Sequence, residues 1–420
     1  MTEEMVKTGN RVPKTRQWIL GALTLAGGYI YGKMIFARNW YILLAAFTAV
    51  FVAAGLFSAA KKERIRKKDS LVWLLFTGAA GLWILLYGGK PDQDICGYVI
   101  LFLHAAGVYW IMVLSESRLD GCLDERGLLD LMRGLFVIPI THFEKWFCAL
   151  GNFLSCILKA RRKASGNVKQ AAAGVLLSIP VICIVLPLLM GADEGFRQMV
   201  AGVTGGLSQW LWGVWDWSTA ILWVFAILVS CYLFGLFFGA FENQRKEPPK
   251  RASLPAAMLT AFTAVILIVY SVFFLTKLAG IPQAMADIQE GTLLRSTYAR
   301  NGFFELCWIA SINFAVFSLV NWYWPAGKDR KKQIALSILG IQTLGFILLA
   351  LFRMGFYIAG YGLTFKRVFT TWFMVVLLAA FVLMTIGNWK KLQSIRISVL
   401  FGCASFLLLA YSNIPAWAAG

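Results

Sequence analysis

The sequence predicts an all-α protein, a polytopic transmembrane helix bundle, from its composition, its long apolar stretches and the placement of its basic residues. Of the 420 residues, 59% are hydrophobic and only 15% are charged, and the mean hydropathy is +0.68. A water-soluble globular chain does not carry so few polar side chains for its length. The formal net charge of +19 therefore does not indicate a nucleic-acid partner, and we expect none.

Apolar stretches long enough to cross a membrane recur along the whole chain. The hydrocarbon core requires roughly 20 mostly apolar residues per helix, and about eleven stretches meet that length. The spans are predicted at residues 18–36, 40–60, 70–88, 95–115, 170–190, 218–240, 254–276, 303–324, 333–353, 368–388 and 395–412. No convincing small-residue cleavage site follows the first span, so we expect it to be retained as an anchor.

Basic residues alternate between the loops that join these spans. Most of the 40 Lys and Arg residues fall in every second loop, as in the run Lys61–Lys68, whereas the intervening loops, such as Pro91–Asp94, are acidic or sparsely charged. Loops rich in Lys and Arg stay on the cytoplasmic side of a membrane. The pattern predicts that the N-terminus lies inside and the C-terminus outside.

The longest inside segment divides the chain. Residues 116–169 separate an N-terminal membrane segment, residues 1–115 with four spans, from a C-terminal membrane segment, residues 170–420 with seven spans. The inside segment is therefore expected to be a cytoplasmic loop that joins two groups of helices.

This loop contains one predicted helix. Thr141 and Glu144 have the spacing of a capping box at a helix N-terminus, and apolar residues then recur every three or four positions among lysines and arginines. The pattern predicts a cytoplasmic amphipathic interfacial helix near 142–160. Two interpretations remain open: the helix recognises anionic lipids, or it is an ordinary connector packed on the bundle.

Motifs for metal binding or catalysis do not occur. The eight cysteines are scattered without a Cys-x-x-Cys pair, and the chain has only two histidines, so neither a disulfide framework nor a zinc site is indicated. A Gly-rich phosphate loop, a His-Glu-x-x-His helix and a Gly-x-Ser-x-Gly elbow are all missing from the sequence. We expect no catalytic residues, no metal and no cofactor, and the sequence favours a protein that is not an enzyme.

Ionisable residues at membrane depth are costly, so the few that occur are candidate site residues. His104 lies in the middle of the fourth predicted span. A neutral imidazole at this position either relays protons or hydrogen-bonds a neighbouring helix, and the absence of a second titratable group on its own helix favours the hydrogen bond.

A polar cluster is predicted near the outer ends of two later spans. Glu305 lies near the outer end of the eighth span, Arg353 ends the ninth, and Tyr357 follows Arg353 at helical spacing. Together with Arg300 and Tyr361, these residues are the candidate ligand or structural cluster. Its two interpretations are a helix-locking ion pair among aromatic rings and a site for a ligand or ion.

The same residues carry a resemblance to a known family. The stretch Tyr298–Leu306 resembles the Tyr-Ala-Arg-x-Gly-Phe-Phe-Glu-Leu motif of a bacterial membrane family, the domain-of-unknown-function group 4153/4173. Arg353–Thr364 resembles that family's Arg-x-x-x-Tyr-x-x-x-Tyr-Gly-Leu-Thr. The resemblance implies a multipass protein of the bacterial cytoplasmic (inner) membrane without an established activity. Relatives tend to continue past the last span into a polar tail, so a function of that tail is not expected of this sequence.

Two functions from different classes are consistent with these features. The first is transport or binding of a lipid, an amphiphile or a small charged ligand. The alternative is a membrane signalling or assembly subunit that docks a protein partner through its basic cytoplasmic loops. The expected partners are membrane lipids, including anionic lipids of the cytoplasmic leaflet, and under the alternative a second protein.

Overall fold

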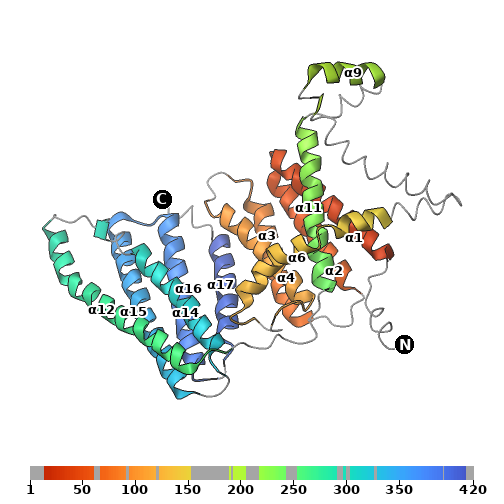
Figure 1. Cartoon of the computed structure of the whole chain (residues 1–420). Helices are drawn as coiled ribbons and strands as arrows, with labels where there is room; N and C mark the ends of the chain where they lie inside the picture. The colour runs from red at the N-terminus through yellow and green to blue at the C-terminus, as the bar shows by residue number, and fades with distance from the viewer. Residues whose placement is uncertain are drawn as a thin grey trace, which may run out of the picture. The chain divides into compact units, whose positions relative to one another are not determined.

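A computed structural model describes residues 14–60, 67–90, 94–119, 123–152, 189–190, 193–204, 217–242, 253–290, 297–298, 303–325, 329–390 and 392–412 (Figure 1). In these ranges the regular elements are all helices, and ten of them are long and apolar enough to cross a membrane. The predicted all-α multipass fold is therefore confirmed. The predicted span at 170–190 lies outside the described residues, and the orientation of the termini stays a prediction.

The ten long helices match the other predicted spans. They are α1 (Lys14–Phe36), α2 (Trp40–Ala59), α3 (Lys67–Tyr87), α4 (Cys96–Leu114), α11 (Trp217–Glu242), α12 (Ala256–Gln289), α14 (Phe303–Tyr323), α15 (Arg330–Tyr361), α16 (Phe365–Gly387) and α17 (Ser394–Tyr411). Shorter elements are α5 (Gly127–Met132), the π-helix η1 (Arg133–Val137), α6 (Ile138–Thr141) and α9 (Glu194–Thr204).

The described helices group into two compact units. The N-terminal unit holds α1 to α4, η1, α6, α9 and α11, and the C-terminal unit holds α12, α14 to α17 and residues 119–128. The long helix α11 thus groups with the first four spans, and the predicted division of the chain into membrane segments at residues 1–115 and 170–420 stays a prediction. The units are defined by which helices contact each other in space, and a boundary placed at one position in the sequence does not contain that information.

Small residues bring α1 and α11 together in the N-terminal unit. A Cβ atom added at Gly28 would collide with the carbonyl oxygen of Ala226 and the hydroxyl of Ser230, and one added at Gly32 would lie 3.1 Å from the carbonyl oxygen of Leu222. Glycines four residues apart on one helix face let two membrane helices approach at backbone distance. The separation between α1 and α11 is therefore set by these two glycines.

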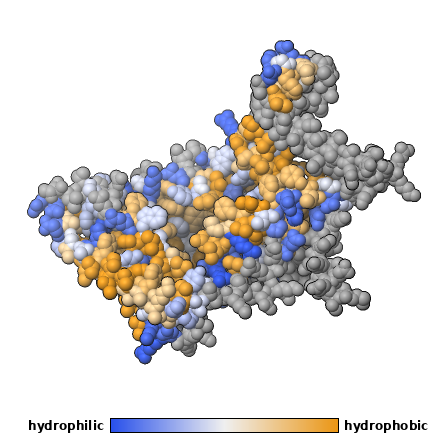
Figure 2. Space-filling model, in the orientation of Figure 1, coloured by the Kyte–Doolittle hydropathy of each residue, from blue (hydrophilic) through white to orange (hydrophobic). Residues whose placement is uncertain are grey.

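Aromatic packing holds the C-terminal unit around α15. Phe346 of α15 is fully buried, and its ring meets the rings of Tyr270, Phe273 and Phe274 from α12. On the opposite face of α12 the large apolar side chains are exposed, and Figure 2 shows hydrophobic surface along the sides of this unit. Such an outer face is suited to hydrocarbon, because lipid tails are as apolar as the side chains.

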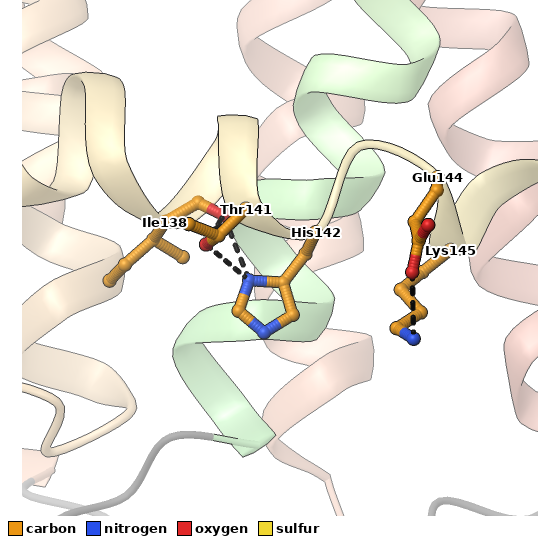
Figure 3. Close-up of polar contacts among 5 residues, drawn as sticks. All are labelled: Ile138, Thr141, His142, Glu144 and Lys145. Carbon is orange, nitrogen blue, oxygen red and sulfur yellow. Dashed lines mark hydrogen bonds and ion pairs between the residues drawn. The ribbon is translucent and has the colours of Figure 1, made fainter.

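The segment around Thr141 differs from the predicted capping box (Figure 3). Thr141 ends α6, and its hydroxyl donates backward to the carbonyl oxygen of Val137 at 2.8 Å. Helix resumes only at Lys145 and is described as far as Asn152, so the remainder of the predicted 142–160 helix lies outside the described residues. Glu144 accepts a hydrogen bond from Lys145 at 3.1 Å, and this bond and its charge raise the pKa of Lys145. Because Lys145 is the basic partner, its ammonium stays charged to a higher pH than usual.

Replacing Gly28 with Ala is predicted to lower the stability of the N-terminal unit by about 1–3 kcal/mol, because the added methyl group overpacks the α1–α11 contact. Gly21→Ala on the same helix is the matched control, since a Cβ there meets nothing within 4 Å. Thermal unfolding of both variants in detergent micelles checks the prediction, and equal melting temperatures would contradict it.

Candidate functional site

A partly open cavity of about 270 Å³ lies between the helices of the N-terminal unit. Helices α1, α2, α3, α4 and α11 all contribute to its wall, together with Leu135 of η1. Most lining side chains are apolar. The polar ones are Tyr31, Thr48, Thr77, His104 and Tyr232.

His104 is held in one tautomer by two hydrogen bonds. Its Nδ1 lies 2.7 Å from the carbonyl oxygen of Ile100, which only accepts, so Nδ1 carries the proton. Nε2 is then the acceptor of a hydrogen bond from the hydroxyl of Tyr31 in α1, at 3.2 Å. Both nitrogens of a neutral imidazole are used, and the pair links α4 to α1 across the cavity wall.

The other polar side chains of the wall also donate their hydrogen bonds to groups of the protein. The Thr48 hydroxyl donates to the carbonyl oxygen of Leu44 at 2.8 Å, and Tyr232 donates to that of Leu135 at 2.9 Å. Thr77 likewise donates to the carbonyl oxygen of Trp73 at 2.9 Å. The described lining residues include no Lys, Arg, Asp or Glu. What the cavity offers a ligand is therefore hydrocarbon contact and a few oxygen lone pairs.

Four residues of the predicted outer cluster lie in the described part of the chain, and the cluster itself stays a prediction. Glu305 forms an ion pair with Lys277 of α12, with 3.7 Å between Oε2 and Nζ. Arg353 is buried, and its guanidinium lies 4.8 Å from the centre of the Tyr298 ring. Glu305 of the first motif thus pairs with Lys277, whereas Arg353 of the second motif lies against Tyr298. Arg300 lies outside the described residues.

Tyr357 and Tyr361 take part in the turn from α15 to α16. Arg367 of α16 lies 4.2 Å from the centre of the Tyr357 ring, and its Nη1 donates to the carbonyl oxygens of Tyr361 at 2.7 Å and Gly362 at 2.6 Å. The last carbonyl groups of a helix have no partner within the helix, and a cation is favourable at that end. This arginine therefore closes the C-terminus of α15.

Gly362 makes the same turn sterically possible. Its φ is +72° and its ψ is −177°, a conformation that is essentially restricted to glycine. The turn between α15 and α16 thus accounts for the glycine of the Tyr361-Gly362 pair in the second motif.

Sequence reasoning had singled out His104 but none of the four other polar residues of the cavity wall. The signal for Tyr31 and Tyr232 was weak, because a tyrosine in an apolar span looks like ordinary packing. Lys277 was missed for another reason: it lies inside a long helix and has no motif of its own. In the described residues no group of three or more His, Cys, Asp and Glu side chains is arranged to hold a metal ion.

Comparison with known families matches residues 19–420 to the family described as Domain of unknown function (DUF4153). The chain belongs to that family, and the resemblance inferred from the two motifs is confirmed. Comparisons with curated proteins and with solved structures gave no match.

The Tyr31–His104 pair is predicted to contribute to stability through its hydrogen bond. In His104→Leu the partly buried Tyr31 hydroxyl loses its acceptor, which costs about 1 kcal/mol. Adding Tyr31→Phe removes the orphaned hydroxyl, so the double variant should be less destabilised than the sum of the single variants. A double-mutant cycle by thermal unfolding checks this, and strict additivity would contradict it.

Gly362→Ala is predicted to destabilise the C-terminal unit by about 1–3 kcal/mol, because alanine is strained at the glycine conformation. Gly355→Ala, in α15 seven residues earlier, is the control: it has open space for a Cβ and lies within the helix, where alanine is favoured. Opposite shifts in melting temperature are expected, and a neutral Gly362→Ala would contradict the prediction.

Proposed function

We propose that the protein binds the hydrocarbon part of a lipid or another amphiphile in the cavity beside His104. The observation that supports this most directly is the wall chemistry: a space of about 270 Å³ among membrane helices, lined by apolar side chains and by polar groups whose donors are already bonded. Ligand pockets of this kind are mainly apolar with a few polar groups that fix orientation.

The wall chemistry separates the three ligand classes that the sequence left open. A small charged ligand would lose its hydration and find neither an opposite charge nor a free donor on the described wall, which is a large cost. A hydrocarbon chain contacts the rings of Phe47 and Phe51 and has no charge or hydrogen bond to give up on entering. A hydroxyl or amide on the ligand can still donate to the oxygen of Tyr31 or Tyr232.

The depth of the cavity supports the same ligand class. His104 is eight residues from the start of α4, which corresponds to about 12 Å along a helix axis at 1.5 Å per residue. Half of the hydrocarbon core measures about 15 Å, so His104 lies close to the middle of the bilayer. Lipid tails occupy this depth, and transport of an amphiphile would require a site there.

The test uses two leucines of α4 that differ in exposure. Leu103 lines the cavity and is 4% exposed, whereas Leu101 is 69% exposed on the same helix. Leu103→Trp fills the cavity and Leu101→Trp does not. Organic extracts of the purified variants are compared by mass spectrometry, with the expectation that a co-purifying amphiphile is present in wild type and Leu101→Trp and strongly depleted in Leu103→Trp.

Folding is controlled by the melting temperature of each variant, and His104→Gln provides a milder change of the same wall. Equal amounts of amphiphile in the two tryptophan variants would overturn the proposal. Wild-type protein that carries no amphiphile but retains a second polypeptide would overturn it in favour of the assembly-subunit alternative.

A further inference from the structure

A second cavity of the N-terminal unit lies where the helical segment 145–152 packs on α1. Its volume is about 180 Å³. Trp18, Gly21 and Leu25 contribute from the first turns of α1, and Trp146, Ala149 and Leu150 contribute from the segment. Nothing in the proposal for the His104 cavity uses this space, and the two cavities share no lining residue.

Trp146 places a buried polar group in this mostly apolar cavity, whose wall also includes the polar side chain of Gln17 and the indole of Trp18. The side chain is only 7% exposed, and its indole nitrogen Nε1 has no hydrogen-bond partner in the described structure. An indole N–H can only donate, and a buried donor without an acceptor is unfavourable. A ligand that fills the cavity and brings an acceptor oxygen would remove this cost.

The cavity begins at the end of α1 that is expected on the basic side of the membrane. From Gln17 to Leu25 the cavity follows α1 over eight residues, or about 12 Å of helix, which is the depth from the lipid ester groups into the upper acyl chains. Tryptophan side chains favour this interfacial zone. Arg16 and Lys145 adjoin the cavity in sequence on either side, but Arg16 donates to the carbonyl oxygen of Phe57 and Lys145 is paired with Glu144. The positive charge available to a headgroup therefore comes from the further basic residues that the sequence places on this face.

We propose that this cavity seats one acyl chain of an anionic phospholipid from the leaflet on the basic side, with Trp146 Nε1 donating a hydrogen bond to an ester or phosphate oxygen of that lipid. The apolar wall selects a hydrocarbon chain, and the unused donor selects an oxygen at the head of the chain. The basic surroundings favour an anionic headgroup over a zwitterionic one. Segment 145–152 then both packs on α1 and holds a lipid against it.

The first test fills the cavity without disturbing its walls. A Cβ added at Gly21 meets nothing within 4 Å, so Gly21→Leu projects a side chain into open space that belongs to the cavity. Gly78→Leu is the matched control, because Gly78 is an exposed helical glycine of α3 with equally open surroundings. Full-length protein is reconstituted with phosphatidylglycerol and examined by native mass spectrometry at rising collision energy.

Wild type and Gly78→Leu are expected to retain one tightly held phosphatidylglycerol that Gly21→Leu loses. Equal lipid retention by the two leucine variants, at equal melting temperatures, would overturn the proposal. Phosphatidylcholine in place of phosphatidylglycerol is expected to be retained less, and equal retention of the two lipids would overturn the anionic assignment.

The second test removes only the donor. Trp146→Phe keeps an aromatic ring, and the loss of one hydrogen bond should weaken phosphatidylglycerol retention about fivefold. Trp223→Phe on α11 is the control, because that tryptophan is partly exposed and does not line the cavity. Identical retention by both phenylalanine variants would overturn the role of Trp146. Neither test touches the His104 cavity, so failure here leaves that proposal unaffected.

Discussion

The close contact between α1 and α11 determines the geometry of the N-terminal unit. Gly28 and Gly32 allow the backbones of two helices that are far apart in sequence to touch. Tyr31 follows Gly28 by three residues, and Val229 and Tyr232 lie beside the α11 contact, so the same approach brings these side chains to one cavity wall. A wider helix separation would open this wall to lipid, because membrane helices have no hydrophobic force that draws them together.

Hydrogen-bond satisfaction imposes a second constraint, and it shapes the chemistry of the cavity. Without water, a polar side chain among membrane helices must bond to the protein, and the simplest acceptor for a threonine is a carbonyl of its own helix. Thr48 and Thr77 use this acceptor, whereas Tyr31 and Tyr232 reach other elements. The hydroxyl donors of these four residues are therefore used inside the protein, and this is the feature of the wall on which the proposed binding of a hydrocarbon chain rests.

The sequence alone was sufficient to predict the long helices and the family, but it did not predict which side chains contact each other. Hydropathy located the ten long helices because helix formation in hydrocarbon depends on length and apolarity alone. The partner of Glu305 was not predictable, since Lys277 meets it only through the packing of two helices. The capping box failed because the Thr141 hydroxyl has a competing acceptor four residues back, which the spacing of Thr141 and Glu144 does not reveal. His104 was identified by its rarity, whereas the tyrosines around it resembled packing residues.

The family match spans both units, but the two sequence motifs lie in the C-terminal unit, whereas the His104 and Trp146 cavities lie in the N-terminal unit. In the C-terminal unit, Arg367 and Gly362 close the end of α15 by satisfying helix carbonyls and by adopting a glycine conformation, which are requirements of the backbone. The two cavities of the N-terminal unit are defined by volume, apolar walls and single donors. A backbone conformation such as that of Gly362 can be recognised in a sequence, because it is essentially restricted to one residue type. A cavity wall is harder to recognise, because many different apolar residues can line it. In the second motif, the conformation of Gly362 and the contacts of Arg367 are thus explained by the turn between α15 and α16.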